Sequence, residues 1–214
     1  MLIEFETLIL STVCLVAAAS YIVASWAKQS FAAALSKTVA STSFIILALV
    51  NEASESVYGR YVLVALVLCW CGDMFLLSRQ SSFLLSGIIA FFFAHVAFVS
   101  GFLQLSHDPT YFLIALGCTS IAGSLILSWL WKYLEGPYKG AVALYLLMMV
   151  IMLSLAIAAT EVPLIGVAAI LFAISDVSVA RDRFVSRDIA NKAWGLPLYY
   201  IAQLLFAASV ITVV

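Results

Sequence analysis

The feature of this sequence that most constrains its fold is a series of long apolar runs separated by short polar stretches. A helix needs about 20 predominantly apolar residues to cross the hydrocarbon core of a bilayer. The runs predict eight such helices, at residues 5–26, 36–51, 59–78, 83–104, 110–131, 138–159, 163–181 and 193–213. We therefore expect an all-α, polytopic membrane bundle with eight transmembrane helices, organised as a single transmembrane domain over residues 1–214.

The composition excludes other classes of protein. Hydrophobic residues make up 65% of the chain and charged residues 10%, whereas a soluble domain has about 45–50% apolar and about 25% charged residues. The net charge of −1 leaves no basic excess for binding nucleic acid. The four cysteines lie inside apolar runs without a C-x-x-C pair, and only two histidines are present. We therefore expect membrane lipids as partners, no nucleic acid and no metal.

The distribution of cations predicts the orientation in the membrane, because Lys and Arg near helix ends stay on the cytoplasmic side. Nine of the ten cations fall on one side of the alternating pattern, namely Lys28, Lys37, Arg79, Lys132, Lys139, Arg181, Arg183, Arg187 and Lys192. Only Arg60 falls on the other side. We expect an integral multi-pass protein of a bacterial inner membrane with both termini non-cytoplasmic.

Two acidic residues, Asp73 and Asp176, are embedded in apolar sequence within the predicted helices, away from the outer ends where the other acids of that side lie. An aspartate at the centre of a spanning helix costs about 2.5–3.5 kcal/mol on insertion scales, so such a residue suggests a functional site. The two helices run in the same direction, and each aspartate precedes the predicted cytoplasmic end by a similar distance. We expect the pair to face one pocket, although a carboxyl group that only bonds a neighbouring helix is the simpler alternative for either residue.

Other polar residues are expected near the same level. They are Lys37 at the start of the second helix, Tyr145 in the sixth, and Tyr200 with Gln203 on one face of the eighth. His95 is expected nearer the midplane. Each has a purely structural alternative: a snorkelling anchor for Lys37, an aromatic belt for Tyr200, an interhelical hydrogen bond for Gln203 and a satisfied core histidine for His95. A metal held by His95 and the two aspartates is a weaker alternative.

Three segments of the chain carry recognisable motifs. They are Cys71–Leu77 followed by Phe83, Gly87, Phe91 and His95; Gly166 with Leu171–Asp176 and Phe184; and Tyr199–Leu204. Together they resemble the YhhN-like lysoplasmalogenase family. These match the family's G-D-x-x-L-L, L-F-x-x-S-D and Y-Y-x-A-Q signatures in the right order on the right helices. Arg60 and, apart from Phe184, the segment 181–192 match no family motif.

The resemblance implies hydrolysis of the vinyl ether bond of lysoplasmalogens, which releases a fatty aldehyde and glycerophosphoethanolamine or glycerophosphocholine. It implies Asp73 and Asp176 as an acid/base pair, with Lys37, His95, Tyr145, Tyr200 and Gln203 as substrate-binding residues and no cofactor. The alternative is a proton-coupled transporter or lipid carrier that uses the same aspartates. The identity of the acid, the role of His95, the head-group preference and the oligomeric state stay open at this point.

Overall fold

Within residues 2–213, which the computed structural model describes, the chain forms eight α-helices joined by short connections. The helices are α1 (Leu2–Trp26), α2 (Ser30–Val50), α3 (Val57–Phe75), α4 (Ser81–Phe102), α5 (Pro109–Trp131), α6 (Pro137–Ala158), α7 (Leu164–Ala180) and α8 (Ile189–Ser209). A π-helical turn, Arg181–Val185, extends α7, and a 3-10 turn, Val210–Thr212, follows α8. The prediction of an eight-helix bundle is confirmed.

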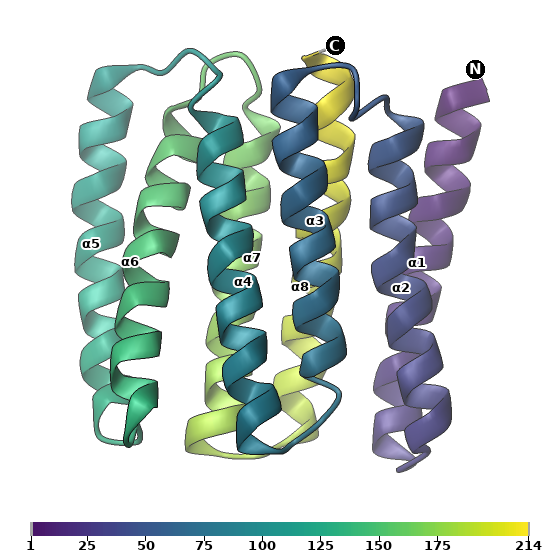
Figure 1. The fold of residues 1–214 in the computed structure, drawn as a ribbon, viewed down its shortest axis with the longest axis vertical. Coiled ribbons are helices and arrows are strands. Elements are labelled where there is room, and N and C mark those ends of the chain that lie inside the picture. The colour runs from purple at the N-terminus through teal and green to yellow at the C-terminus, as the bar shows by residue number, and fades with distance from the viewer. Residues whose placement is uncertain (1, 214) are drawn as a thin grey trace.

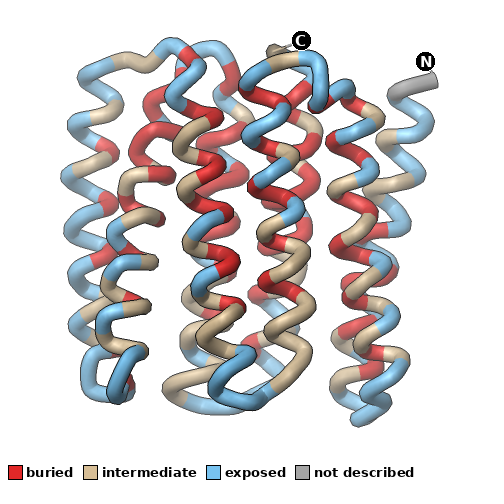
Figure 2. Tube along the Cα trace, in the orientation of Figure 1, coloured by how far each residue is buried: buried red, intermediate tan, exposed pale blue. Residues whose placement is uncertain are grey.

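All eight helices are long and apolar enough to cross a membrane. Their outward faces are apolar as well: on α5, Leu113, Ile121 and Leu125 are 66%, 66% and 67% exposed. Figure 2 shows the buried residues on the faces that helices turn toward one another, while α5 is exposed along most of its length. Exposed apolar side chains of this extent are suited to contact with lipid tails. The protein is an integral multi-pass membrane protein.

The helices pack as four antiparallel hairpins, α1–α2, α3–α4, α5–α6 and α7–α8. The bundle is elongated in cross-section, with α5 at one edge and α1 and α2 at the other, and α7 and α8 lie behind α4 and α3 (Figure 1). Both ends of the chain lie at the same end of the bundle. The opposite end, formed by the connections 27–29, 76–80, 132–136 and 186–188, is called the cation-rich end.

Two predicted helix starts were wrong. Helix α2 begins at Ser30 rather than at residue 36, so Lys37 lies well inside the helix rather than at its start. Helix α8 begins at Ile189 rather than at residue 193, because Asp188 accepts a hydrogen bond from the backbone N–H of Ala190 (3.0 Å) and caps the helix. The predicted loop 181–192 is thus reduced to residues 186–188.

Two close helix approaches position the site. A Cβ added at Gly72 of α3 would lie 2.5 Å from the ring of Phe91, so the missing side chain lets α4 pack against α3 directly beside Asp73. A Cβ added at Gly195 of α8 would overlap the hydroxyl of Ser178 on α7. The glycines therefore fix the spacing of the helices on either side of the two aspartates.

Candidate active site

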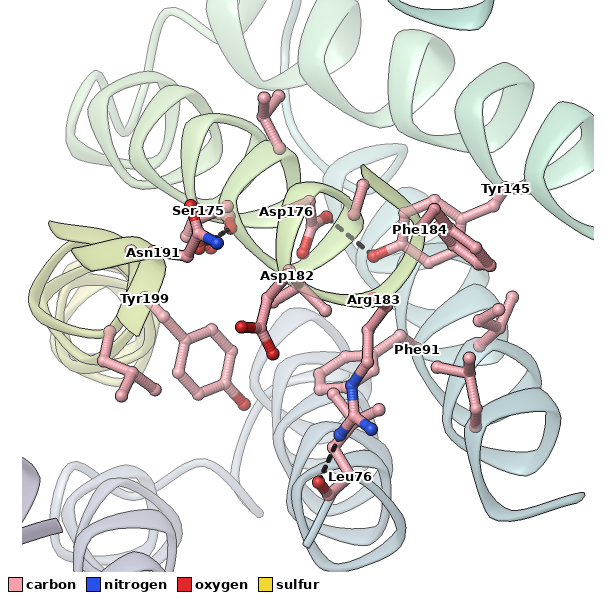
Figure 3. Close-up of a pocket in the computed structure, with 18 of the residues that line it drawn as sticks. Leu76, Phe91, Tyr145, Ser175, Asp176, Asp182, Arg183, Phe184, Asn191 and Tyr199 are labelled. Carbon is pink, nitrogen blue, oxygen red and sulfur yellow. Dashed lines mark hydrogen bonds between the residues drawn. The ribbon is translucent and has the colours of Figure 1, made fainter. Parts of the chain in front are cut away.

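A pocket opens at the cation-rich end of the bundle, and Figure 3 shows Asp176 and Arg183 among the residues that line it. Its lining residues come from all eight helices. Its polar side, formed by α1, α2 and α8, consists of Tyr21, Lys37, Asn191, Lys192 and Tyr199. Its apolar side, formed by α4, α5 and α6, consists of Leu84, Ile88, Ile126, Leu130, Val142, Leu146 and Met149. Asp73 and Asp176 line the pocket from α3 and α7, which stand between these two groups of helices. A pocket with one polar and one apolar side suits an amphiphilic ligand.

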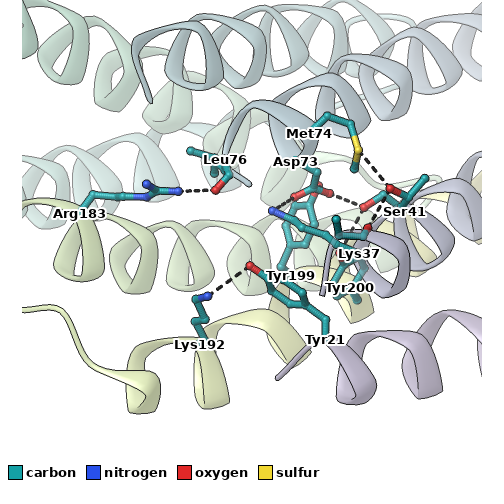
Figure 4. A network of polar contacts seen from close by, with 12 residues as sticks. Tyr21, Lys37, Ser41, Asp73, Met74, Leu76, Arg183, Lys192, Tyr199 and Tyr200 are labelled. Atoms are coloured by element: carbon teal, nitrogen blue, oxygen red, sulfur yellow. Dashed lines mark hydrogen bonds and ion pairs between the residues drawn. The ribbon is translucent and has the colours of Figure 1, made fainter. Parts of the chain in front are cut away.

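Asp73 is almost completely buried and is surrounded by donors (Figure 4). The ammonium Nζ of Lys37 lies 3.0 Å from Oδ1. The hydroxyls of Ser41 and Tyr199 donate to Oδ2 at 2.6 and 2.9 Å. A buried carboxylate needs a counter-charge and hydrogen bonds to both oxygens, and Asp73 has both. This environment stabilises the ionised form of Asp73.

Asp176 has a different set of neighbours. The hydroxyl of Tyr145 donates to Oδ2 at 2.6 Å. Nε2 of His95 lies 3.9 Å from the same oxygen, beyond hydrogen-bond distance. No Lys or Arg within residues 2–213 lies within ion-pair distance of Asp176. Because nothing here supplies a full positive charge, the pocket favours the ionised form of Asp176 much less than that of Asp73.

Only one of the two ring nitrogens of His95 has a hydrogen-bond partner among the described residues. Nδ1 lies 2.7 Å from the carbonyl oxygen of Phe91, which can only accept, so Nδ1 carries the hydrogen. In the neutral ring Nε2 then presents a lone pair toward Asp176. The side chain is fully buried and does not line the pocket, so it contacts the site from behind Asp176 rather than from the side of a ligand.

A layer of packed aromatic rings adjoins Tyr145, which lines the pocket. His95 stacks on Phe172 with ring centroids 4.9 Å apart and meets Tyr145 edge-on at 4.8 Å. Beyond it, Phe98 packs against Phe206 at 4.3 Å. The rings of His95, Phe172, Phe98 and Phe206 are all fully buried.

Comparison with known proteins identifies the family of the chain. Residues 32–210, most of the chain, match the sequence pattern of the YhhN family. The chain belongs to the YhhN family. This family is the lysoplasmalogenase family, so the resemblance seen in the sequence is confirmed. No curated protein and no solved structure matches the chain.

The YhhN motifs lie around the pocket. In the first, Gly72 provides the close contact with Phe91 and Asp73 provides the buried carboxylate. In the second, Ser175 precedes Asp176, and both line the pocket. In the third, Tyr199 contacts Asp73. The three segments, which are far apart in the sequence, therefore form one site.

The structure brings four of the predicted site residues to the pocket wall: Asp73, Asp176, Lys37 and Tyr145. Tyr200 and Gln203, expected beside them, do not line it. The hydroxyl of Tyr200 lies 3.2 Å from that of Ser41, so Tyr200 reaches Asp73 only indirectly, through Ser41. Gln203 is fully buried, and neither of its amide atoms has a hydrogen-bond partner in the part of the chain described.

Sequence reasoning missed several residues of the polar side, above all Tyr199, which occupies the place expected for Tyr200. Neighbouring residues on a helix point about 100° apart, so either tyrosine of the pair could have faced the pocket. Tyr21 and Asn191 carried no distinguishing signal. Across residues 2–213, no three His, Cys, Asp or Glu side chains lie close enough together to share a metal ion.

Proposed function

We propose that this YhhN protein hydrolyses the vinyl ether bond of lysoplasmalogens such as lysoplasmenylethanolamine and lysoplasmenylcholine. The products are a fatty aldehyde and glycerophosphoethanolamine or glycerophosphocholine. The observation that carries the proposal is the placement of two differently surrounded carboxyl groups, Asp73 and Asp176, in one pocket between a polar and an apolar side. Membership of the lysoplasmalogenase family supports the same reaction.

The reaction needs one proton donor and one anion, and the neighbours of the two aspartates divide these roles. Asp176, which has a single hydroxyl donor and no cation, is the general acid. Asp73, held by Lys37 and two hydroxyls, is the permanent anion. Other hydrolases place two carboxyl groups in contrasting surroundings, which keeps one of them protonated and the other ionised.

Asp176 transfers its proton to the alkene carbon that is remote from the ether oxygen. The positive charge that develops on the carbon bonded to oxygen is stabilised by the carboxylate of Asp73. Water adds to that carbon and loses a proton to Asp176, which regenerates the acid. The resulting hemiacetal breaks its bond to the glycerol oxygen, which takes the hydroxyl proton, and the aldehyde is released.

The arrangement of the pocket fixes the direction of the lipid. The alkyl chain occupies the apolar side formed by α4, α5 and α6, near Tyr145 and Asp176. The glycerol part lies toward the polar side and Asp73. In this direction the remote alkene carbon, which carries the alkyl chain, lies nearer Asp176, and the ether oxygen lies nearer Asp73, as the two roles require.

The test is aldehyde release by the purified protein in detergent micelles, without any ion gradient. Lysoplasmenylethanolamine is the substrate, and the saturated alkyl ether analogue, which has no alkene to protonate, is the control. Because general acid–base catalysis contributes about 10²–10⁴-fold, we expect Asp73→Asn and Asp176→Asn each to lose at least about a hundredfold in turnover. Glu135→Gln, an exposed acid at the same end, is the matched control.

A loss below about tenfold in both aspartate variants would place the acid elsewhere. Absence of aldehyde from the wild-type protein would favour transport instead. The buried aromatic layer of His95, Phe172, Phe98 and Phe206 gives no support to a path through the bundle. The proposal includes the orientation inferred from the cations, in which the pocket opens to the cytoplasmic leaflet of a bacterial inner membrane.

A further inference from the structure

Two cations border the same pocket and take no part in the chemistry proposed above. Arg183 lies in the π-helical turn after α7, and Lys192 lies in the first turn of α8. In the chain from residue 2 to residue 213, neither has a carboxylate within ion-pair distance. Cations that face a pocket without an acidic partner favour the binding of an anion.

Arg183 is held in place by neutral groups. Its guanidinium donates to the backbone carbonyl oxygens of Ser78 (3.2 Å) and Leu76 (2.5 Å), at the end of α3. Figure 3 shows the side chain crossing the mouth of the pocket from α7 toward Leu76. A guanidinium has five N–H donors in a fixed plane. The two carbonyls therefore fix its position without neutralising its charge or using all of its donors.

Lys192 is held in a similar way on the other side of the polar end. Its Nζ lies 3.3 Å from the hydroxyl of Tyr21 and 3.4 Å from that of Ser25, and 5.0 Å from the centre of the Tyr21 ring (Figure 4). Lys37 lies 5.6 Å from the same ring. Lys37 is neutralised by Asp73, whereas the partners of Lys192 are uncharged.

The other charges at this rim compensate each other. Asp182 also lines the pocket, and its Oδ2 lies 3.5 Å from Nη2 of Arg79. The pairs Lys37–Asp73 and Arg79–Asp182 are each neutral as a pair. With Asp176 protonated as the general acid proposed above, Arg183 and Lys192 therefore leave the polar end of the pocket with an excess of positive charge.

We propose that Arg183 and Lys192 bind the phosphate group of a single-chain phospholipid whose alkyl chain lies on the apolar side of the pocket. The position of the chain rests on the function proposed above. The phosphate diester is an anion with oxygens suited to the planar fork of an arginine and the point charge of a lysine. The bound phosphate holds the lipid so that the bond between the glycerol and the chain lies beside the two aspartates.

Binding, rather than turnover, tests this subsite. The probes are a saturated 1-O-alkyl lysophosphatidylethanolamine and the matching 1-O-alkylglycerol, which lacks the phosphate, titrated calorimetrically into the wild-type protein in detergent. Because hydrogen bonds to charged groups are stronger than neutral ones, we expect the phospholipid to bind at least about tenfold more tightly than the alkylglycerol. Lys192→Gln and Arg183→Gln are expected to remove most of that difference and to leave the affinity for alkylglycerol unchanged.

Matched controls are Lys132→Gln and Arg187→Gln, two exposed cations of the same end that do not line the pocket. Arg183→Lys, which keeps the charge, is expected to retain part of the preference. If Arg183→Gln fails to fold because the α3 carbonyls lose their donor, Lys192→Gln still decides the question, since Lys192 does not contact them.

Equal weakening of both probes in the variants would mean a structural role and would overturn the proposal. Affinity for inorganic phosphate as high as for the phospholipid would identify a free anion as the ligand and would also overturn it. An intact phosphate preference in a protein that releases no aldehyde would contradict the proposed function and support the subsite.

Discussion

The buried pair formed by Lys37 and Asp73 allows the effect of removing one charge to be predicted. The two side chains are 4% and 3% exposed, and Nζ lies 3.0 Å from Oδ1. Lys37→Met keeps an unbranched apolar chain of similar length and removes the ammonium group. Among the described residues, Asp73 is then left with the hydroxyls of Ser41 and Tyr199 as its donors. The uncompensated charge is expected to destabilise the protein.

Breaking a buried ion pair by removing one partner costs about 3–5 kcal/mol. Because two hydroxyl donors at 2.6 and 2.9 Å remain, we expect a loss in the free energy of unfolding near the lower limit, about 3 kcal/mol. In the double variant Lys37→Met/Asp73→Asn neither charge is left unpaired. Its loss is expected to be smaller than the sum of the two single losses by about 1–3 kcal/mol.

The assay is equilibrium unfolding of the purified protein in mixed micelles by titration with dodecyl sulfate, followed by tryptophan fluorescence. Lys132→Met, at an exposed lysine of the same end, is the control and is expected to change stability by less than about 0.5 kcal/mol. The reasoning is refuted if Lys37→Met behaves like this control, or if the two single losses add up to the loss of the double variant.

Four further outcomes are expected. Tyr145→Phe removes the hydroxyl donor of Asp176 and lowers turnover about tenfold, whereas Tyr200→Phe, one residue away from the carboxylates, has a smaller effect; equal effects would contradict the assignment. Gly195→Ala lowers the unfolding midpoint because the new methyl overlaps Ser178, and adding Ser178→Gly restores part of the loss. Treatment with a chelator leaves aldehyde release unchanged, and a loss restored by a divalent metal would contradict this. Reporter fusions place the C-terminus outside the cytoplasm, and an active cytoplasmic reporter there would overturn the orientation.

The number of helices could be predicted from the sequence because the length of an apolar run directly reflects the thickness of the membrane. The error at α2 has a physical origin. A lysine near an apolar run usually marks the end of a helix, but Lys37 is neutralised by Asp73 and therefore lies within α2. Because the partner is on another helix, the sequence around Lys37 contains no sign of this pairing.

The two aspartates could be found from the sequence because a carboxyl group in apolar surroundings is unusual. The different neighbours of the two aspartates could not be predicted, because they depend on how each helix is rotated about its axis. The adjacent Tyr199 and Tyr200 show this: one contacts Asp73 and the other lies behind Ser41. The start of α8 had a usable signal, because Asp188 is a typical N-cap residue.

Helix α1 lies entirely outside the region that matches the family pattern, yet its Tyr21 forms part of the polar wall of the pocket and contacts Lys192. Two relatives can therefore share every residue of the matched region and still differ in the wall that faces the polar part of a ligand. Divergence in α1 is a route by which selectivity can change while the two aspartates and their immediate partners, which lie on α2, α3, α6, α7 and α8, stay the same. When sequences of this family are compared, the segment before residue 32 is therefore the place to look for differences in ligand preference.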